Sequence, residues 1–129
     1  MDLNQVTIGA VDFHASLDFY TKLGLKLIVL ADGRYARFEM PAGSSTLSLH
    51  HDAAHNPGGT VIYFEVDEID DKYARLLALG VEFDSPPRDE SWNWREARFR
   101  DPAGNKLCLF HAAADRRFPP WRLESSSAS

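Results

Sequence analysis

The sequence predicts an α+β fold made of two copies of one unit, each with the order strand, helix, strand, strand, strand. Residues 36–43 and 97–104 are identical at six of eight positions. A helical pattern of apolar residues ends at a glycine in both halves, at Gly24 and Gly80. An alternating pattern typical of a strand follows each copy of the short repeat. The same features in the same order indicate a duplicated unit rather than a chance match of two turns.

Each unit contains one predicted helix. Apolar residues at helical spacing define the first helix, at Phe13, Leu17 and Tyr20, and the second, at Ile69, Tyr73, Leu76 and Leu77. Asp12 and Asp67 stand just before these patterns, where a side-chain oxygen can cap free backbone N–H groups. The two glycines provide the left-handed conformation that ends a helix.

The strands are predicted around these helices. Strands 5–11 and 60–66 precede the helices, and strands 26–30 and 81–84 follow them. The next strand of each unit contains Ala-Arg-Phe, and strands 46–49 and 106–109 close the units. The turn Asp101-Pro102-Ala103-Gly104 suits a β-turn, because proline presets φ and glycine accepts a positive φ.

These elements predict one domain at residues 1–112. Module one covers 1–52, a polar linker covers 53–58, and module two covers 59–112. A unit of about 55 residues is marginal alone, so the modules are expected to pack together. Residues 113–129 form a tail whose last residues are predicted to be disordered. In this tail, Phe118 and Trp121 either anchor the segment on the domain or a partner chain, or belong to a loosely held end.

Composition limits the class of function. The 129 residues are 44% hydrophobic and 26% charged, which excludes a disordered chain. The formal net charge of -5 argues against nucleic acid and anionic membranes as partners. With Cys108 as the only cysteine and no secretory pattern at the start, the sequence favours a soluble cytoplasmic protein.

The repeated pattern resembles the vicinal oxygen chelate superfamily, which includes glyoxalase I, extradiol dioxygenases and bleomycin-resistance proteins. The resemblance lies in Asp-Phe-His-Ala-Ser-Leu-Asp-Phe-Tyr at 12–20, Leu-Gly-Leu at 23–25 and Asp-Pro-Ala-Gly-Asn at 101–105, and it covers about residues 3–112. It implies two tandem βαβββ modules whose eight strands form a curved sheet around a cup, with the helices outside. It also implies a homodimer.

In metal-using members of this superfamily, four side chains in the cup hold a divalent ion. The matching positions in this chain are Gln5, Ser48, Val61 and Cys108. Only Gln5 is a usual ligand, because valine has no donor and a serine hydroxyl is weak. The expectation is therefore no metal and no other cofactor. A shifted site made of Gln5, His50 and Glu65 is the alternative, against the simpler view that these side chains meet water or an arginine.

Strand alternation and the resemblance together give a set of side chains expected to line the cup and bind a ligand. They are Gln5, Thr7, Tyr35, Arg37, Ser48, His50, Tyr63, Glu65, Trp92, Trp94, Glu96, Arg98 and Cys108. By the same alternation, Phe38 and Phe99 point to the helices with Ala36 and Ala97.

This lining suits an organic ligand with an aromatic or apolar body and a carboxylate end. Arg37 and Arg98 can take a carboxylate as a fork, and Trp94 can stack on a ring. The alternative is an internal network in which Arg98 pairs with Glu96 and Arg37 with Glu65. Segment 84–95 can be a lid over the cup or a packed strand.

Two functions remain in view from the sequence. The first is a binding protein that holds a small organic molecule, as bleomycin-resistance-type members do. The second is a glyoxalase-like enzyme, a lyase, isomerase or transferase with an altered metal site. No catalytic residue is assigned, because Cys108 has no histidine at a recognisable spacing and single buried cysteines are mostly inert. A third possibility is an interaction role for an empty cup.

Overall fold

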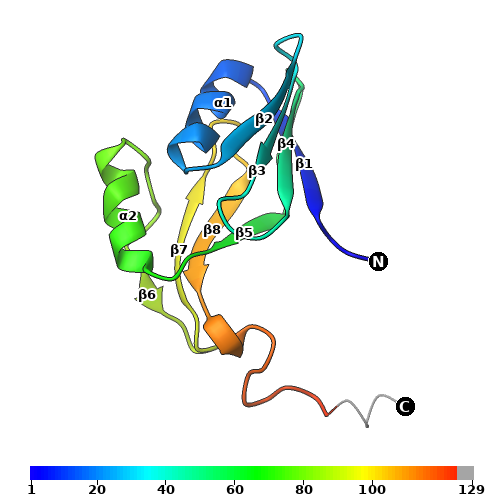
Figure 1. The fold of residues 1–129 in the computed structure, drawn as a ribbon. Helices are drawn as coiled ribbons and strands as arrows, with labels where there is room; N and C mark the ends of the chain where they lie inside the picture. The colour runs from blue at the N-terminus through cyan, green and yellow to red at the C-terminus, as the bar shows by residue number, and fades with distance from the viewer. Residues whose placement is uncertain (125–129) are drawn as a thin grey trace.

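The computed structural model describes residues 1–124 and shows two modules of the same design (Figure 1). Module one contains β1 (Gln5–Ala10), α1 (Phe13–Lys22), β2 (Lys26–Ala31), β3 (Tyr35–Glu39) and β4 (Thr46–His51). Module two contains β5 (Val61–Glu65), α2 (Ile69–Ala78), β6 (Arg88–Asp89), β7 (Arg95–Arg100) and β8 (Lys106–His111), followed by the short 3-10 helix η1 (Ala113–Asp115). The predicted α+β class with two βαβββ modules is confirmed. The predicted disorder at the C-terminal end concerns residues 125–129, which lie outside the described residues.

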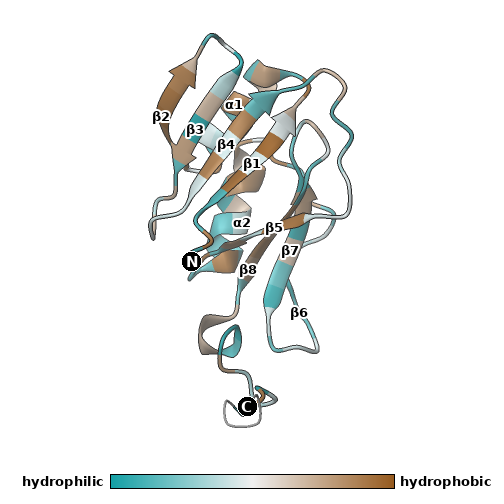
Figure 2. Cartoon of the chain, turned by 90° about the vertical axis from the view of Figure 1, so that its right-hand side faces the viewer, coloured by the Kyte–Doolittle hydropathy of each residue, from teal (hydrophilic) through white to brown (hydrophobic). Residues whose placement is uncertain are grey.

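Each module forms its own four-stranded sheet. Sheet one has the order β1-β4-β3-β2 and sheet two the order β5-β8-β7-β6. In both, the first and last strands of the module run parallel and the other pairs run antiparallel. Among residues 1–124, no strand pairing joins one sheet to the other. Figure 2 shows both sheets from the side away from the helices, one above the other. We call this side of each sheet its helix-free face.

The helix ends follow the sequence in three of four cases. Asp12 caps α1, because its carboxylate accepts a hydrogen bond from the backbone nitrogen of Ala15 at 3.1 Å. Gly24 and Gly80 end the helices with φ values of 98° and 92°. The prediction that Asp67 caps α2 is wrong: the N-cap residue is Glu68, which makes no side-chain cap bond.

The second module departs from the prediction after α2. Residues 81–84 do not form a strand, and only Phe83 makes an isolated bridge, to Phe99. Val81 is buried at the end of α2, and the rings of Phe83 and Phe99 lie 4.5 Å apart between centroids. The strand that pairs with β7 is the two-residue β6, which begins after two prolines that cannot donate ladder hydrogen bonds.

The helix sides of both sheets share one hydrophobic core. Phe38 and Ala36 lie in it from β3, and Phe99 lies in it from β7, as alternation predicts. Phe19 of α1 packs on Phe99 of module two, with ring centroids 6.1 Å apart. The modules are therefore joined through their helix side, where apolar burial stabilises both.

A polar network crosses between the modules beside this core. Tyr20 donates to Asp101 at 2.6 Å, and Asn105 donates to Asp101 at 2.8 Å and to the carbonyl oxygen of Gly9 at 3.0 Å. The linker residue His55 contacts Asn105 through its Nε2 atom at 2.7 Å. A Cβ atom at Gly9 would overlap the imidazole of His55. The linker and β1 thus fit against each other only because position 9 has no side chain.

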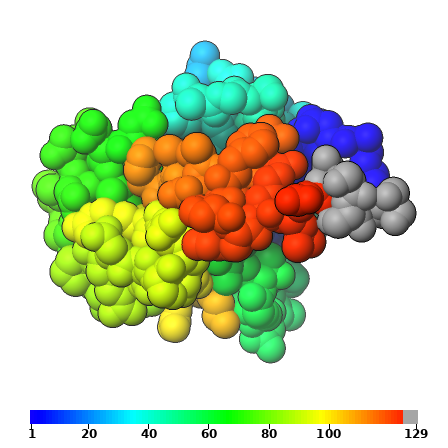
Figure 3. Space-filling model, turned by 90° about the horizontal axis from the view of Figure 1, so that it is seen from below, coloured from blue at the N-terminus to red at the C-terminus, as the bar shows by residue number. Residues whose placement is uncertain are grey.

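The C-terminal segment lies on the surface at the lower end of the molecule (Figure 3). Phe118 and Trp121 are both more than half exposed, and the guanidinium of Arg122 lies 4.4 Å from the centroid of the Phe118 ring. Neither residue is therefore buried against the domain. Within residues 1–124, no helix is long and apolar enough to cross a membrane.

Candidate functional site

Twelve of the thirteen predicted ligand-binding residues fall into two groups, one on the helix-free face of each sheet, and Trp92 lies outside both in the turn before β7. Sheet one carries Gln5, Thr7, Tyr35, Arg37, Ser48 and His50, and sheet two carries Tyr63, Glu65, Trp94, Glu96, Arg98 and Cys108. The side-chain hydrogen bonds of these residues on the helix-free faces stay within one module. The structure therefore brings each group together, and among residues 1–124 no side-chain hydrogen bond joins one group to the other.

On sheet one, three polar side chains form a chain of hydrogen bonds. The hydroxyls of Tyr35 and Ser48 lie 2.8 Å apart, and the Nε atom of Arg37 donates to Tyr35 at 3.0 Å. The hydrogen bond from Ser48, assisted by Arg37, lowers the pKa of the Tyr35 phenol. Ser48 is fully buried in this arrangement. The tyrosine holds the guanidinium in place and leaves its outer nitrogen atoms available.

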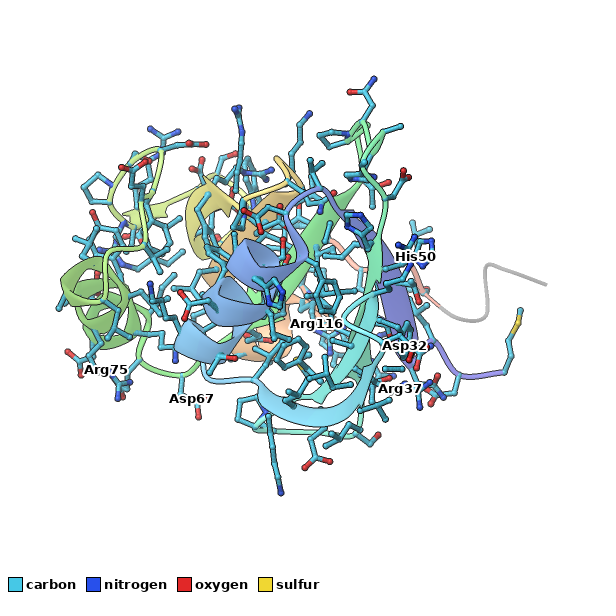
Figure 4. The ribbon with its side chains drawn as sticks, turned by 90° about the horizontal axis from the view of Figure 1, so that it is seen from above. Asp32, Arg37, His50, Asp67, Arg75 and Arg116 are labelled. Atoms are coloured by element: carbon cyan, nitrogen blue, oxygen red, sulfur yellow. The ribbon has the colours of Figure 1, made fainter. Side chains whose placement is uncertain are left out.

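Arg37 differs in one respect from Arg98, its counterpart in the repeat. Arg98 forms an ion pair with Glu96 at 3.1 Å and donates to the hydroxyl of Tyr63 at 3.3 Å. Among residues 1–124, no carboxylate forms an ion pair with Arg37. In Figure 4, Arg37 and His50 both lie on the side of the molecule away from α1. The internal network predicted as an alternative is thus present on sheet two and absent on sheet one.

Aromatic side chains cover part of the helix-free face of sheet two. Trp94 stacks on Phe110 with centroids 4.7 Å apart, and Tyr63 meets both rings edge-on. Cys108 lies beneath them with no exposed surface. Burial, followed by the nearby charge of Glu96, raises the pKa of the Cys108 thiol to about 12. The thiol therefore stays protonated near neutral pH, which is the state of an inert buried cysteine rather than of a nucleophile.

Glu96 has a second carboxylate oxygen without a partner. The residue is almost completely buried, and its Oε2 atom makes no hydrogen bond in the described structure. Arg98 neutralises the charge through the other oxygen. The Glu96–Arg98 pair is therefore a structural ion pair within sheet two. Because its charge is neutralised by Glu96, Arg98 is less able to bind an anionic ligand.

Two other predicted residues have structural partners. The carboxylate of Glu65 accepts hydrogen bonds from the backbone nitrogens of Ala112 and Ala113 at 2.7 and 2.8 Å. The predicted pairing of Glu65 with Arg37 does not form, because Glu65 instead fixes the start of η1 and approaches Arg116. Gln5 accepts a hydrogen bond from Thr46 at 2.9 Å.

Segment 84–95 is a hairpin held to the domain. Arg95 forms ion pairs with Asp70 of α2 at 2.9 Å and with Asp89 of β6 at 3.2 Å. Trp92, at the tip, is 40% exposed. These ion pairs favour a fixed strand connection over a lid.

A cleft of about 420 Å³ lies where module one meets the linker and module two. Four consecutive residues of β1 line it, from Val6 to Gly9, together with His50 of β4. The opposite wall includes Pro57 and Ile62. The cleft thus combines apolar side chains with polar and charged ones, and it reaches the helix-free face of sheet one. The polar and charged side chains that line it are Thr7, His50, Asp52, His55, Thr60, Asn105 and Lys106.

The superfamily's metal positions hold donors that do not suit a divalent ion. Val61 has none, the hydroxyl of Ser48 is engaged by Tyr35, and the Cys108 thiol keeps its proton. The amide oxygen of Gln5 is engaged by Thr46. In residues 1–124, no three His, Cys, Asp or Glu side chains gather in a ligating group. In the shifted set of Gln5, His50 and Glu65, the Glu65 carboxylate is engaged by the backbone nitrogens of Ala112 and Ala113. The residues present do not fit the ion.

Sequence reasoning missed Phe110 and the linker residue His55. Phe110 shares the helix-free face with Cys108 by strand alternation, so its position in the aromatic cluster could have been found. The contact of His55 with Asn105, 50 residues away, has no local signal in the sequence.

Comparison with known proteins places the chain among related folds. The model of the Glyoxalase/Bleomycin resistance protein/Dioxygenase superfamily matches residues 2–109. A glyoxalase/bleomycin resistance protein/dioxygenase from Nocardioides is similar at 33% identity, with a TM-score of 0.76 over 96% of this chain and 90% of that one. Lactoylglutathione lyase from Agrobacterium tumefaciens shares the fold at 21% identity, with a TM-score of 0.72 over 95% and 97% of the two chains. A bleomycin resistance determinant encoded on transposon Tn5 does so at 21% identity, with a TM-score of 0.69 over 86% and 98%. No curated protein sequence matches.

Proposed function

Because the chain belongs to the glyoxalase/bleomycin resistance protein/dioxygenase superfamily, we propose that it binds a small organic carboxylate through Arg37, without a divalent metal. In this proposal the apolar or aromatic body of the ligand extends from Arg37 across β4 toward the cleft that borders β1. The observation that carries this proposal is the difference between the two repeated arginines: Glu96 neutralises Arg98, whereas no carboxylate pairs with Arg37 among the described residues. The protein acts in this proposal as a cytoplasmic homodimer with no nucleic-acid or membrane partner.

The geometry of sheet one supports an anionic ligand. The hydrogen bond from the Arg37 Nε atom to Tyr35 fixes the plane of the guanidinium, and Tyr35 is itself fixed by Ser48. A held guanidinium loses little conformational freedom when it binds a carboxylate through two parallel hydrogen bonds. Thr7 and Arg37 flank Ser48 on the two neighbouring strands, so the arginine lies two strands from the edge that borders the cleft.

The cleft supports an apolar ligand body. The apolar part of its lining consists of Val6, Ile8, Pro57 and Ile62, beside the polar and charged side chains already described. A volume of about 420 Å³ lies within the range of small-molecule sites. Burial of a ring or alkyl chain there would add to the charge interaction at Arg37.

Matched pairs of ligands test the role of charge. Benzoate and indole-3-acetate are compared with their neutral amides, benzamide and indole-3-acetamide, by thermal unfolding at several ligand concentrations. We expect at least one carboxylate to raise the melting temperature while its amide does not. At a concentration ten times the Kd, binding would stabilise the native state by about 1.4 kcal/mol.

A matched pair of variants tests the role of Arg37. Arg37→Gln should abolish the stabilisation by the carboxylate, whereas Arg75→Gln, on exposed helix α2, should keep it. Equal effects of acid and amide, or carboxylate binding that survives Arg37→Gln, would overturn the proposal. Metal analysis of protein purified without a histidine tag tests the statement that binding needs no divalent metal. A stoichiometric divalent ion that carboxylate binding requires would favour the glyoxalase-like enzyme instead.

A further inference from the structure

The imidazole of His55 is held in one orientation at the cleft. Its Nε2 atom lies 2.7 Å from the Oδ1 atom of Asn105, and its ring lies so close to Gly9 that a Cβ atom there would overlap it. The backbone nitrogen of His55 donates to the carbonyl oxygen of Asp52 at 3.0 Å, which fixes the start of the linker. The linker, β1 and the turn before β8 therefore position this ring together.

The partners of Asn105 decide which nitrogen of His55 carries the proton. The Nδ2 atom of Asn105 donates to the carbonyl oxygen of Gly9 at 3.0 Å and to the Asp101 carboxylate at 2.8 Å. Both groups only accept hydrogen bonds, so a flipped amide would turn its oxygen toward them and lose both bonds. The Oδ1 atom of Asn105 therefore faces His55, and it can only accept. The neutral imidazole must carry its proton on Nε2, which leaves a lone pair on Nδ1.

The Nδ1 atom of His55 can accept a hydrogen bond from outside the chain. It makes no hydrogen bond among residues 1–124, and it is not fully buried. Because His55 lines the cleft, a molecule in the cleft can reach this atom. The charge of Asp101 polarises the Asn105 amide, and hydrogen bonds linked in this way strengthen one another. The cleft therefore presents a fixed hydrogen-bond acceptor.

The register of sheet one places this acceptor relative to Arg37. The His55 ring lies over Gly9 of β1, which pairs with His50 of β4, whereas Arg37 of β3 pairs with Ser48. Arg37 and Gly9 are thus two strands and two residues apart, which is about 12 Å between Cα atoms. Each hydrogen bond takes up about 3 Å, so a ligand that reaches both groups has its donor on the order of 6–9 Å from its carboxylate.

From this arrangement we propose that His55 determines the specificity of the site: its Nδ1 atom accepts a hydrogen bond from an N–H or O–H group at the far end of the ligand. The ligand class is then a carboxylate whose aromatic or apolar body ends in a hydrogen-bond donor, such as a hydroxyphenyl group. This inference rests on the proposed function, because Arg37 takes the carboxylate. It adds a second polar contact in the cleft, on a linker residue rather than on a sheet.

Three matched acids test whether the site requires a donor. Isothermal titration of the full chain compares 3-(4-hydroxyphenyl)propanoate with 3-(4-methoxyphenyl)propanoate, which keeps the oxygen but cannot donate, and with 3-phenylpropanoate, which is smaller. The hydroxy acid should bind about three- to tenfold more tightly than the other two, as one neutral hydrogen bond provides. An affinity for the hydroxy acid no higher than that for 3-phenylpropanoate overturns the inference.

Substitutions at His55 test the acceptor atom. His55→Gln places an amide nitrogen where Nε2 lies, so the bond to Asn105 can remain while the acceptor at Nδ1 is lost. This variant should bind all three acids equally. His55→Asn places an amide oxygen near the Nδ1 position and should restore part of the preference. His14→Gln, the same change at an exposed histidine of α1, should keep the full preference. A preference that survives His55→Gln, in a variant with wild-type melting, overturns the inference.

Nitrogen NMR of the labelled full chain tests the tautomer without any ligand. At pH 8 the His55 imidazole should be protonated at Nε2 and unprotonated at Nδ1, and His55→Gln identifies its signals. The opposite tautomer overturns the inference whatever the acids do. Addition of p-cresol, a donor without a carboxylate, should shift the Nδ1 resonance, whereas 4-methylanisole should not.

These results separate the inference from the proposed function. A chain that responds to p-cresol but binds no carboxylate contradicts the role of Arg37 and leaves the acceptor at His55 standing. A chain that binds the three acids equally through Arg37 keeps the proposed function and overturns the role of His55. A chain that responds to neither p-cresol nor the acids overturns both.

Discussion

The hydroxyl of Tyr20 in α1 donates a 2.6 Å hydrogen bond to the carboxylate of Asp101, 81 residues away in the turn between β7 and β8. Tyr20 is completely buried, and burial, followed by the charge and the hydrogen bond of Asp101, raises the pKa of its phenol. The hydroxyl therefore keeps its proton and remains a donor near neutral pH. The bond ties the helix of module one to the turn of module two at the margin of the shared core.

Loss of this hydroxyl should destabilise the protein. Tyr20→Phe keeps the ring and leaves a nearly buried carboxylate with one donor fewer, which should cost about 1–3 kcal/mol in urea unfolding. Tyr73→Phe is the control, because the ring of Tyr73 packs on Phe83 and its hydroxyl makes no hydrogen bond within residues 1–124. If the two variants lose the same stability, the bond between the modules contributes nothing measurable.

The two repeated arginines should differ in their contribution to stability. Arg98→Met leaves the buried Glu96 carboxylate without its ion pair, and about 1–3 kcal/mol should be lost. The side chain of Arg98 is partly exposed, so water can replace part of the interaction and the lower end of this range is expected. Arg37→Met should change the free energy of unfolding by only about 0.5 kcal/mol. A larger loss for Arg37→Met than for Arg98→Met would show that the assignment of roles is reversed.

The buried thiol should make stability depend on alkaline pH. In the unfolded chain Cys108 ionises near its ordinary pKa of 9.0, whereas in the native state it keeps its proton up to about pH 12. The native form holds more protons in this window, so the free energy of unfolding falls as pH rises from about 9 toward 12. Cys108→Ala lacks this contribution.

The measurement is the difference in unfolding free energy between wild type and Cys108→Ala at pH 8, 9 and 10. We expect the stability advantage of the wild type to shrink as the pH rises. A difference that stays constant would mean that the thiol ionises normally in the folded protein. Reaction of the native thiol with iodoacetamide at pH 8 should be undetectable until the protein is unfolded.

Position 9 should not accept a side chain while His55 is present. Gly9→Ala places a Cβ atom inside the imidazole of His55 and should lower stability by about 1–3 kcal/mol. Gly59→Ala is the control, because a Cβ atom there meets open space. In a double-mutant cycle, His55→Ala should relieve most of the loss caused by Gly9→Ala. If the stability losses of Gly9→Ala and His55→Ala add up in the double variant, the loss at position 9 does not come from the contact with His55.

The features that follow from local pattern were predictable. The helices, the glycines that end them, and the inward direction of Phe38 and Phe99 depend on spacing within a few residues. The predicted strand 81–84 does not form although its residues alternate. Val81 is buried and Phe83 is partly buried, and Phe83 packs its ring on Tyr73 of α2 and Phe99 of β7 with only an isolated bridge to β7. Tertiary packing decided the outcome at this point, and the prolines at 86 and 87 moved the pairing to β6.

For the candidate site, the sequence predicted only which face of the sheet each side chain points to. Alternation placed Tyr35, Arg37 and Ser48 on one face, but it could not show that Glu96 neutralises one arginine while the other has no acidic partner. That choice depends on which side chains reach across strands. The cleft depends on linker residues such as His55, whose contacts are distant in sequence. Neither the ion pairing of the two arginines nor the cleft can be recognised from the sequence next to the residues involved.

The unequal arginines have a consequence for how this protein can change. The residue before the shared Ala-Arg-Phe is Tyr35 in the first half and Glu96 in the second. At this position a carboxylate neutralises Arg98, whereas a neutral phenol holds Arg37 through a hydrogen bond. The duplication thereby gives the chain two copies of the same strand. One copy can keep a structural ion pair while the other changes to bind a different ligand.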